Sequence, residues 1–187
     1  MKAKYRVFGV SLLVLLGLDQ ATKIWVMNNL EYRRDTIDII DGWLLLEHAR
    51  NNGAAFSMLE GQMALLIGFV AVALCVIGYM MWQLEDDDRI QAIALGVIAS
   101  GAMGNGIDRV IHGSVTDFVR FYAEKPPVSD WLIALTGSPA WPTFNVADMS
   151  ILAGVGLSLL GFALADKEDD GLIPDPAAVL LDDIPGS

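Results

Sequence analysis

Residues 62–84, QMALLIGFVAVALCVIGYMMWQL, form an apolar run that contains no Asp, Glu, Lys or Arg. The apolar residues follow one another without the 3.6-residue or alternating spacing of a half-buried helix or strand. A helix needs roughly 20 such residues to cross the hydrocarbon core of a bilayer. The run therefore predicts a transmembrane helix.

Three further runs have the same character, but each carries or borders a few ionisable residues. They cover about residues 7–30, interrupted by Asp19 and Lys23, residues 90–107, which end just before Asp108, and residues 146–165, with Asp148 near the start. With the run at 62–84, they predict an all-α membrane protein with four transmembrane helices. We expect these helices to form one membrane domain over residues 1–165.

The composition excludes several classes of protein. The 187 residues are 54% hydrophobic with a mean hydropathy of +0.48, which is too apolar for a disordered chain. The net charge of −11 argues against a nucleic-acid partner, because nucleic-acid binding needs a basic face. Cys75 is the single cysteine of the sequence, so we expect neither an intrachain disulfide nor a cysteine-based metal cluster.

The N-terminal segment has the basic start and apolar run of a signal peptide. No small-x-small cleavage pattern follows it, and Ile24–Met27 adds another apolar turn, so we favour a retained helix. Lys2, Lys4 and Arg6 place the N-terminus in the cytoplasm by the positive-inside rule. Four crossings then return the C-terminus to the cytoplasm and leave residues 31–61 and 110–145 outside.

The segments between and after the helices also carry local signals. Residues 31–61 contain two strand-like pieces separated by Asp41-Gly42, which predicts a small extracytoplasmic β-sheet. Residues 131–135 are apolar but too short to span a bilayer, and we expect an interfacial helix there. Residues 166–187 hold seven acids and one lysine, which predicts a disordered cytoplasmic tail.

Ionisable residues at membrane depth are costly, so each one is a candidate for function. Asp19 and Lys23 share one helix face, either as a neutralised pair with Lys23 reaching outward or as part of a site. Asn105, Asp108 and Arg109 share a face of the third run. Gly96, Ser100 and Gly104 recur every four residues, which is typical of a close helix contact.

Asp117 and Asp148 form the most suggestive pair. Taken singly, Asp117 fits a turn and Asp148 fits the acidic N-terminus of a helix. The topology brings both to the outer end of the bundle, where close carboxylates adopt different pKa values and can activate water against a peptide carbonyl. His48 and His112 are isolated in the sequence, and we interpret them as polar residues at the membrane interface. They lack the spacing of metal ligands, so we expect no metal and no cofactor.

Five short blocks, all in order on the four-helix frame, resemble the lipoprotein signal peptidase (signal peptidase II) family. They are Asp19-Gln20-x-Thr22-Lys23, Asn51-x-Gly53-Ala54-Ala55-Phe56-Ser57, Gly101-x-x-Gly104-Asn105-x-x-Asp108-Arg109, Val115-x-Asp117-Phe118 and Phe144-Asn145-x-Ala147-Asp148. The resemblance covers about residues 5–165 and implies a membrane aspartic endopeptidase. Such an enzyme removes the signal peptide of a prolipoprotein just before a diacylglyceryl-modified cysteine.

The resemblance also implies roles for particular residues. Asp117 and Asp148 would be the catalytic pair, and substrate binding or support of the site would fall to Asp19, Lys23, Asn51, Gly53, Gly104, Asn105, Asp108, Arg109 and Asn145. The protein would lie in the bacterial inner (plasma) membrane with its active site near the outer face. We expect a monomer surrounded by membrane lipids, with lipid-modified prolipoproteins as substrates.

The chain departs from the family pattern in four places: Ser100, Gly106, the acidic tail, and the long stretch between Asp117 and Asp148 with its insert at 123–143.

Other functions fit less well. A transporter would place ionisable residues near mid-membrane, whereas here they cluster at the outer helix ends. A presenilin-type protease would need Tyr-Asp and Gly-x-Gly-Asp motifs, which do not occur. A structural adaptor would explain none of the five blocks.

Overall fold

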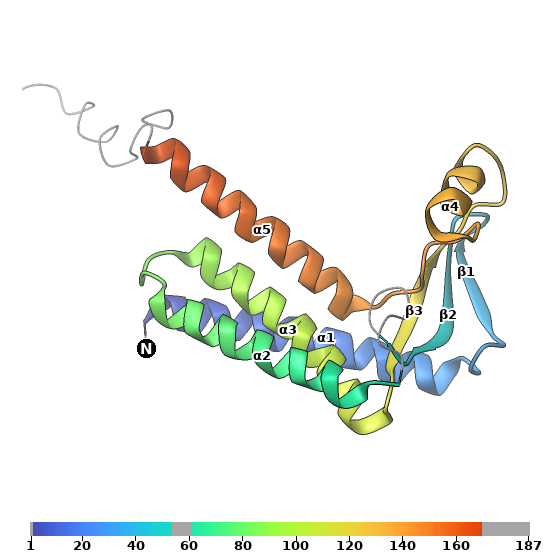
Figure 1. Cartoon of the computed structure of the whole chain (residues 1–187), viewed down its shortest axis with the longest axis horizontal. Helices are drawn as coiled ribbons and strands as arrows, with labels where there is room; N and C mark the ends of the chain where they lie inside the picture. Colours follow the sequence, from blue (N-terminus) through green and yellow to red (C-terminus); the bar gives the residue numbers. More distant parts are fainter. Residues whose placement is uncertain (1, 54–60, 170–187) are drawn as a thin grey trace, which may run out of the picture.

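The computed structural model describes residues 2–53 and 61–169. Its four long helices are α1 (Ala3–Asn29), α2 (Met63–Gln83), α3 (Arg89–His112) and α5 (Val146–Asp169). Each of them is long and apolar enough to cross a membrane. A small sheet and helix α4 (Val128–Thr136) lie at the end of the bundle away from the N-terminus (Figure 1). The predicted four-helix membrane fold with a small β-sheet is therefore confirmed.

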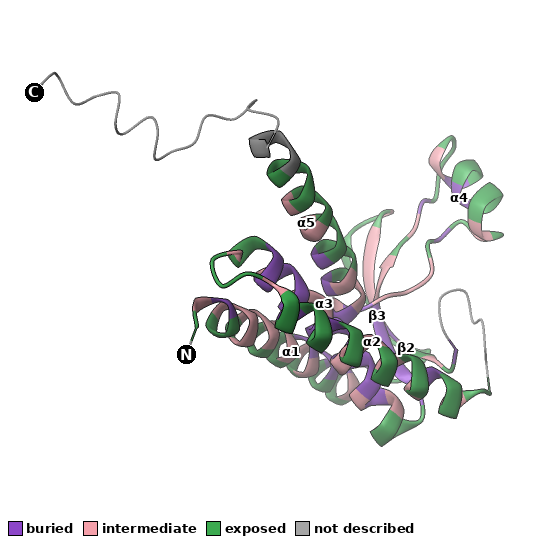
Figure 2. Ribbon diagram, turned by 60° about the vertical axis from the view of Figure 1, so that its left-hand side comes forward, coloured by how far each residue is buried: buried purple, intermediate pink, exposed green. Residues whose placement is uncertain are grey.

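Helix α3 occupies the centre of the bundle, and most of its residues are buried (Figure 2). Glycines allow this close packing. A Cβ on Gly96 would lie 2.6 Å from the Phe8 carbonyl oxygen of α1, and one on Gly101 would lie 2.6 Å from Ile151 Cγ1 of α5. The α3 backbone can therefore approach α1 and α5 closely, as the run of small residues predicts.

The outer faces of the helices are apolar, while polar groups are buried inside. Leu13 is 68% exposed and Leu152 is 76% exposed, whereas Asp19 and Lys23 are each 1% exposed. In water this arrangement would leave large apolar surfaces unpaired. In a bilayer it places the apolar surface against lipid and lets the buried polar groups bind one another.

The sheet has three antiparallel strands in the order β1 (Thr36–Ile40), β2 (Leu44–Asn51) and β3 (Val115–Phe121). The first two strands and the turn between them follow the prediction, and Gly42 in the turn adopts a φ of +76°. Strand β3 was not predicted. Asp117 lies in this strand opposite Ala49 of β2, so its interpretation as a turn residue is wrong.

Several helix ends differ from the predicted boundaries. Helix α3 continues to His112, so Asp108 and Arg109 lie within it. Helix α5 continues to Asp169, so residues 166–169, predicted to begin the disordered tail, are helical; this stretch contains Lys167 and Glu168, which are good helix formers. The rest of the tail and residues 54–57 of the second sequence block lie outside the described residues.

Helix α4 contains the short apolar segment 131–135 and ends at Gly137, whose φ is +74°. Trp131 on this helix is 59% exposed. Such a side chain suits the boundary between lipid and water, and the interfacial position of α4 stays a prediction.

Candidate active site

The start of α5 positions Asp148 through a reciprocal pair of hydrogen bonds. Asn145 precedes the first helical residue, and its Oδ1 accepts from the Asp148 backbone N–H at 3.0 Å. Asp148 Oδ2 in turn accepts from the Asn145 backbone N–H at 3.2 Å. This is a capping box, which satisfies two N–H groups that a helix start leaves unpaired. The second carboxylate oxygen, Oδ1, accepts from Asn105 Nδ2 at 2.8 Å.

Asp117 reaches the same place from β3. Its Oδ1 accepts from Asn145 Nδ2 at 2.7 Å, so one asparagine side chain contacts both aspartates. Burial and the charge of Asp148 raise the pKa of Asp117 to about 7, although hydrogen bonds from Asn145 and Asn51 act in the opposite direction. A carboxyl with such a pKa can hold a proton near neutral pH beside a second carboxyl.

The two aspartates line one cavity of about 490 Å³, together with Asn51, Asn105 and Arg109. The remaining wall is largely apolar and comes from α2, α3, α5 and the segment that follows α4. A cavity with an apolar wall and a few convergent polar groups is typical of a ligand site.

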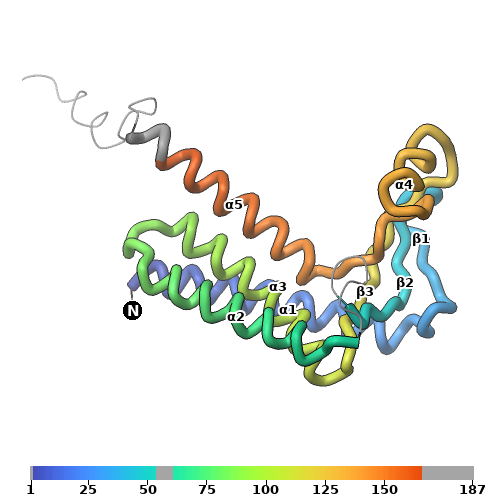
Figure 3. Tube along the Cα trace, in the orientation of Figure 1, coloured from blue at the N-terminus to red at the C-terminus, as the bar shows by residue number. Residues whose placement is uncertain are grey.

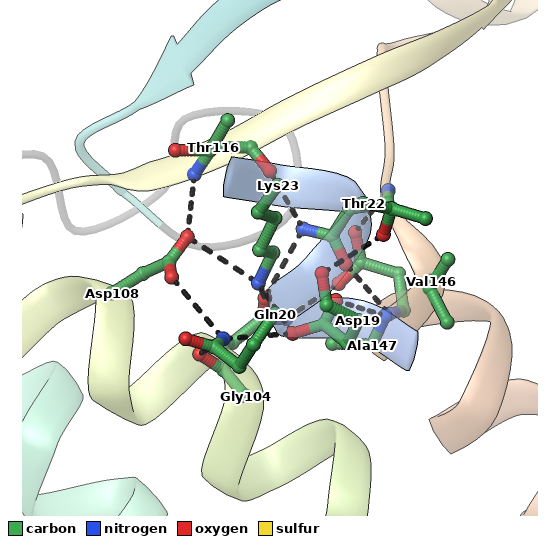
Figure 4. Close-up of polar contacts among 12 residues, drawn as sticks. Asp19, Gln20, Thr22, Lys23, Gly104, Asp108, Thr116, Val146 and Ala147 are labelled. Carbon is green, nitrogen blue, oxygen red and sulfur yellow. Dashed lines mark hydrogen bonds and ion pairs between the residues drawn. The ribbon is translucent and has the colours of Figure 1, made fainter. Parts of the chain in front are cut away.

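A buried ionic cluster of Asp19, Lys23 and Asp108 contacts Thr116 and Ala147, the residues that precede the two aspartates (Figure 4). Lys23 Nζ lies 3.0 Å from Asp19 Oδ2 and 3.3 Å from Asp108 Oδ2. It also donates to Asn105 Oδ1 at 3.0 Å. Lys23 therefore points inward, and the alternative in which it extends toward the membrane edge is wrong.

Each carboxylate of this cluster holds the backbone next to one candidate catalytic residue. Asp19 Oδ1 accepts from the Ala147 N–H at 2.9 Å, one residue before Asp148. Asp108 Oδ2 accepts from the Thr116 N–H at 2.8 Å, one residue before Asp117. Since Lys23 binds both carboxylates, its ammonium group links β3, which carries Asp117, to the start of α5, which carries Asp148. A buried charge set is tolerated only when it is paired and hydrogen-bonded in this way.

Arg109 connects the cavity to the chain that follows β2. Its Nη2 donates to the Gly53 carbonyl oxygen at 2.8 Å, and its Nη1 donates to the Asn105 carbonyl oxygen at 3.2 Å. Asn51 Oδ1 accepts from the Gly53 N–H at 3.0 Å. The Nε of Arg109 is buried and has no hydrogen-bond partner among the described residues.

The structure thus brings every candidate residue named from the sequence into one connected region, with Gly104 packed directly against Asp19. Two hydrogen bonds near the site were not anticipated. Gln20 Nε2 donates to Asp19 Oδ2 at 3.1 Å, and Thr143 near the cavity donates to Glu47 Oε1 at 2.7 Å. The high content of β-branched and aromatic residues over 115–121 could have revealed β3.

Histidine plays no visible part in this cavity. His48 is 5% exposed, and its Nδ1 lies 3.0 Å from the Leu30 carbonyl oxygen, so its side chain is packed inside the protein. Its position at the membrane interface stays a prediction. Within residues 2–53 and 61–169, no group of three or more His, Cys, Asp or Glu side chains is placed to hold a metal ion.

Comparison with known proteins identifies relatives over most of the chain. A family profile described as signal peptidase (SPase) II matches residues 11–164. A lipoprotein signal peptidase of Geobacter metallireducens is 39% identical over 163 residues, which are 86% of this chain and 92% of that protein. The lipoprotein signal peptidase of Deinococcus radiodurans is 34% identical over 167 residues, 89% of this chain and 84% of that protein.

Solved structures agree with the sequence comparison. A bacterial membrane enzyme determined by the in meso method at 2.3 Å resolution superposes with a TM-score of 0.70 and 26% sequence identity, covering 86% of this chain and 88% of that one. A second in meso structure of a bacterial membrane enzyme, at 1.9 Å resolution, gives a TM-score of 0.66.

Proposed function

The chain belongs to the signal peptidase II family, whose members cleave signal peptides from prolipoproteins, and we propose that Asp117 and Asp148 are its catalytic pair. The observation that carries the proposal is the Asn145 side chain, which donates to Asp117 and accepts from the backbone N–H of Asp148. Asn145 binds the Asp117 carboxyl through its side chain and the Asp148 carboxyl through its backbone N–H. Two carboxyl groups held by one residue in one cavity can act as acid and base on the same peptide bond.

The raised pKa of Asp117 assigns it the acid role. Asp148 takes a proton from a water molecule as the water oxygen attacks the scissile carbonyl carbon. Asp117 gives its proton to the carbonyl oxygen, which forms a neutral tetrahedral diol. The C–N bond then breaks as the leaving nitrogen gains a proton from Asp148 and a diol hydroxyl returns its proton to Asp117. The products are a carboxyl group and a free amine, and both aspartates regain their starting states.

Arg109, Asn105 and Asn51 support this chemistry by fixing the cavity. Arg109 lines the cavity, and its Nη2 donates to the Gly53 carbonyl oxygen, so it holds the chain that follows β2 against the site. Asn105 holds the Asp148 carboxylate while its own Oδ1 is held by Lys23 and Asn145. Asp19, Lys23 and Asp108 act as positioning residues.

The substrate bond and the orientation in the membrane complete the proposal. The cut falls on the N-terminal side of the diacylglyceryl-modified cysteine, whose acyl chains stay in the bilayer. The enzyme is a monomer in the bacterial inner membrane with both termini in the cytoplasm. Its sheet end, which carries the cavity, faces outward, in keeping with the basic residues at the other end of α1.

The test is cleavage of a lipid-modified prolipoprotein by the purified protein, followed as mass loss of the signal peptide. Asp117→Asn and Asp148→Asn should each lower the rate at least about 100-fold, because loss of general acid or base catalysis costs on the order of 10²- to 10⁴-fold in rate. Asp41→Asn, at an exposed turn position, is the matched control and should cleave at the wild-type rate. Substantial turnover by either site variant would remove that residue from the mechanism.

A further inference from the structure

A second cavity lies far from the aspartates, at the end of the bundle that carries the N-terminus. It is a groove of about 600 Å³ between the start of α1 and the start of α3. Arg6 and Asp19 lie 13 positions apart on α1, which is roughly 20 Å along a helix. The groove is therefore separate from the catalytic cavity. We call it the α1–α3 groove.

The floor of the α1–α3 groove is a tight helix contact. A Cβ on Gly96 of α3 would lie 2.6 Å from the Phe8 carbonyl oxygen of α1. One turn away, Ser11 Oγ donates to the Ile93 carbonyl oxygen of α3 at 3.5 Å. Because the two backbones are held this close, the groove has a rigid base that does not depend on a ligand.

The walls of the groove are apolar and open to the membrane. Val7, Val10 and Val14 line it from α1 at spacings of three and four residues, which is one face of a helix. Val10 and Val14 are each 62% exposed. Ile93 lines it from α3. An acyl chain lying along this face would remove exposed apolar surface that no described part of the protein covers.

The mouth of the groove holds two arginines, Arg6 and Arg89. Neither forms an ion pair among the described residues. Nearby cations do find partners in the protein. Lys2 Nζ lies 2.8 Å and Lys4 Nζ 3.3 Å from the Asp86 carboxylate in the α2–α3 connection. The arginines thus remain available to an external anion.

Two of the acids closest in sequence to Arg89, Asp88 and Asp86, already have partners. Asp88 Oδ1 accepts from the Gln91 backbone N–H at 3.0 Å, which caps the start of α3. Asp86 binds the two lysines. The N-terminus and the α2–α3 connection lie at the same end of the bundle (Figure 3), so one anion at this end can meet both guanidinium groups.

We propose that the α1–α3 groove binds an anionic phospholipid, with the phosphate between Arg6 and Arg89 and an acyl chain against Val7, Val10 and Val14. Guanidinium groups bind phosphate through paired hydrogen bonds. Basic clefts between helices at the cytoplasmic side are a known form of anionic-lipid site. A phospholipid has both a negatively charged phosphate, which can bind the two arginines, and an acyl chain, which can cover the apolar walls of the groove. A free phosphate would leave those walls exposed.

The test measures lipids retained by the full chain after reconstitution in nanodiscs of equal parts phosphatidylglycerol and phosphatidylcholine. The protein is released into detergent and its bound lipids are counted by native mass spectrometry. Wild-type protein should retain phosphatidylglycerol at least fivefold over phosphatidylcholine. Arg6→Gln/Arg89→Gln should lose that preference, and Arg33→Gln/Arg34→Gln, which removes the same charge at the other end of α1, should keep it.

Two further measurements separate a lipid site from general charge or misfolding. Phosphatidylglycerol added to lipid-free detergent should raise the melting temperature of the wild type but not that of Arg6→Gln/Arg89→Gln. That variant should still cleave prolipoprotein at the wild-type rate, because neither arginine lies near the aspartates. Absence of a preference in the wild type, or an equal loss in Arg33→Gln/Arg34→Gln, would overturn the proposal.

Discussion

Among single residues of the site, Asn145 has the most roles. It caps α5, donates to Asp117, and donates to Asn105 Oδ1 at 3.1 Å. Its side chain is completely buried. An aspartate here would have no N–H donors to give, and an alanine would leave several buried polar groups unpaired. The positions of Asp117 and Asp148 therefore both depend on Asn145.

Ionisation of Asp117 should lower the stability of the protein as the pH rises. Its pKa is about 7 in the folded protein and 3.8 without the fold. The folded state therefore holds a proton that the unfolded state has lost, and stability falls as pH increases from about 4 to about 7. Asp117→Asn removes this effect, and its stability gain over wild type should be larger at pH 8 than at pH 4.5 by up to about 3 kcal/mol.

Thermal unfolding of both proteins in one detergent at the two pH values measures this difference. Asp41→Asn, which removes an exposed carboxyl, serves as the control for the loss of one negative charge. An equal gain for Asp117→Asn at both pH values would contradict the raised pKa.

Glu47 is a candidate positioning residue outside the ionic cluster. It accepts from Thr143 Oγ1 at 2.7 Å and pairs with Arg120 Nη1 at 3.2 Å. Thr143 lines the cavity two residues before Asn145. Glu47→Ala should lower kcat about tenfold, equivalent to about 1.4 kcal/mol, with little change in KM. Glu47→Gln keeps an acceptor oxygen and should recover most of the rate.

The matched control for Glu47 is Glu31→Ala. Glu31 also pairs with an arginine, Arg34, at 2.8 Å, but both side chains are exposed and lie outside the cavity. Exposed pairs of this kind contribute little to stability. A loss of kcat in Glu31→Ala as large as in Glu47→Ala would show that the effect is not specific to the Thr143 contact.

At the scale of elements, the site depends on α1 and α3 fixing the start of α5 and β3. Asp19 of α1 holds the Ala147 N–H of α5, and Asp108 of α3 holds the Thr116 N–H of β3. Gly104 is the point where α3 comes closest to Asp19. The close contact between α1 and α3 at Gly104 therefore also positions the active site.

Gly104→Ala should disrupt this arrangement. The new Cβ would overlap Asp19 Oδ2 and approach its Cγ to 3.1 Å, displacing a carboxylate that binds both Lys23 and Ala147. We expect at least a tenfold fall in kcat and a lower melting temperature. Gly17→Ala is the control, because a Cβ there meets nothing within 4 Å; it should be neutral or up to about 1 kcal/mol stabilising. Equal behaviour of the two variants would contradict the packing argument.

At the scale of the whole molecule, the two cavities lie at opposite ends of the helix bundle. The sheet, α4 and the catalytic cavity lie at one end, and the N-terminus and the α1–α3 groove lie at the other (Figure 1). The reverse orientation would place the cavity on the cytoplasmic side.

Cysteine labelling tests this orientation after Cys75, which is exposed, is replaced by alanine. Cysteines at Asp41 and Asp130, exposed positions in the β1–β2 turn and in α4, should react with an impermeant reagent added to intact spheroplasts. A cysteine at Asp87 in the α2–α3 connection should react only after the membrane is opened. The opposite pattern would overturn the orientation with both termini in the cytoplasm.

The sequence by itself determined the membrane character, the four spans, the β1–β2 hairpin and the candidate residues, because uncharged apolar runs, Asp-Gly turns and short motifs are local patterns. The tertiary structure alone decided that β3 joins the sheet, that Lys23 points inward, and that Asp19 holds the start of α5. The Asp19–Ala147 bond joins residues 128 positions apart, and the Asn145–Asp117 bond joins residues 28 positions apart. Contacts of this kind leave no periodic signal along the chain, since they exist only once the helices have packed.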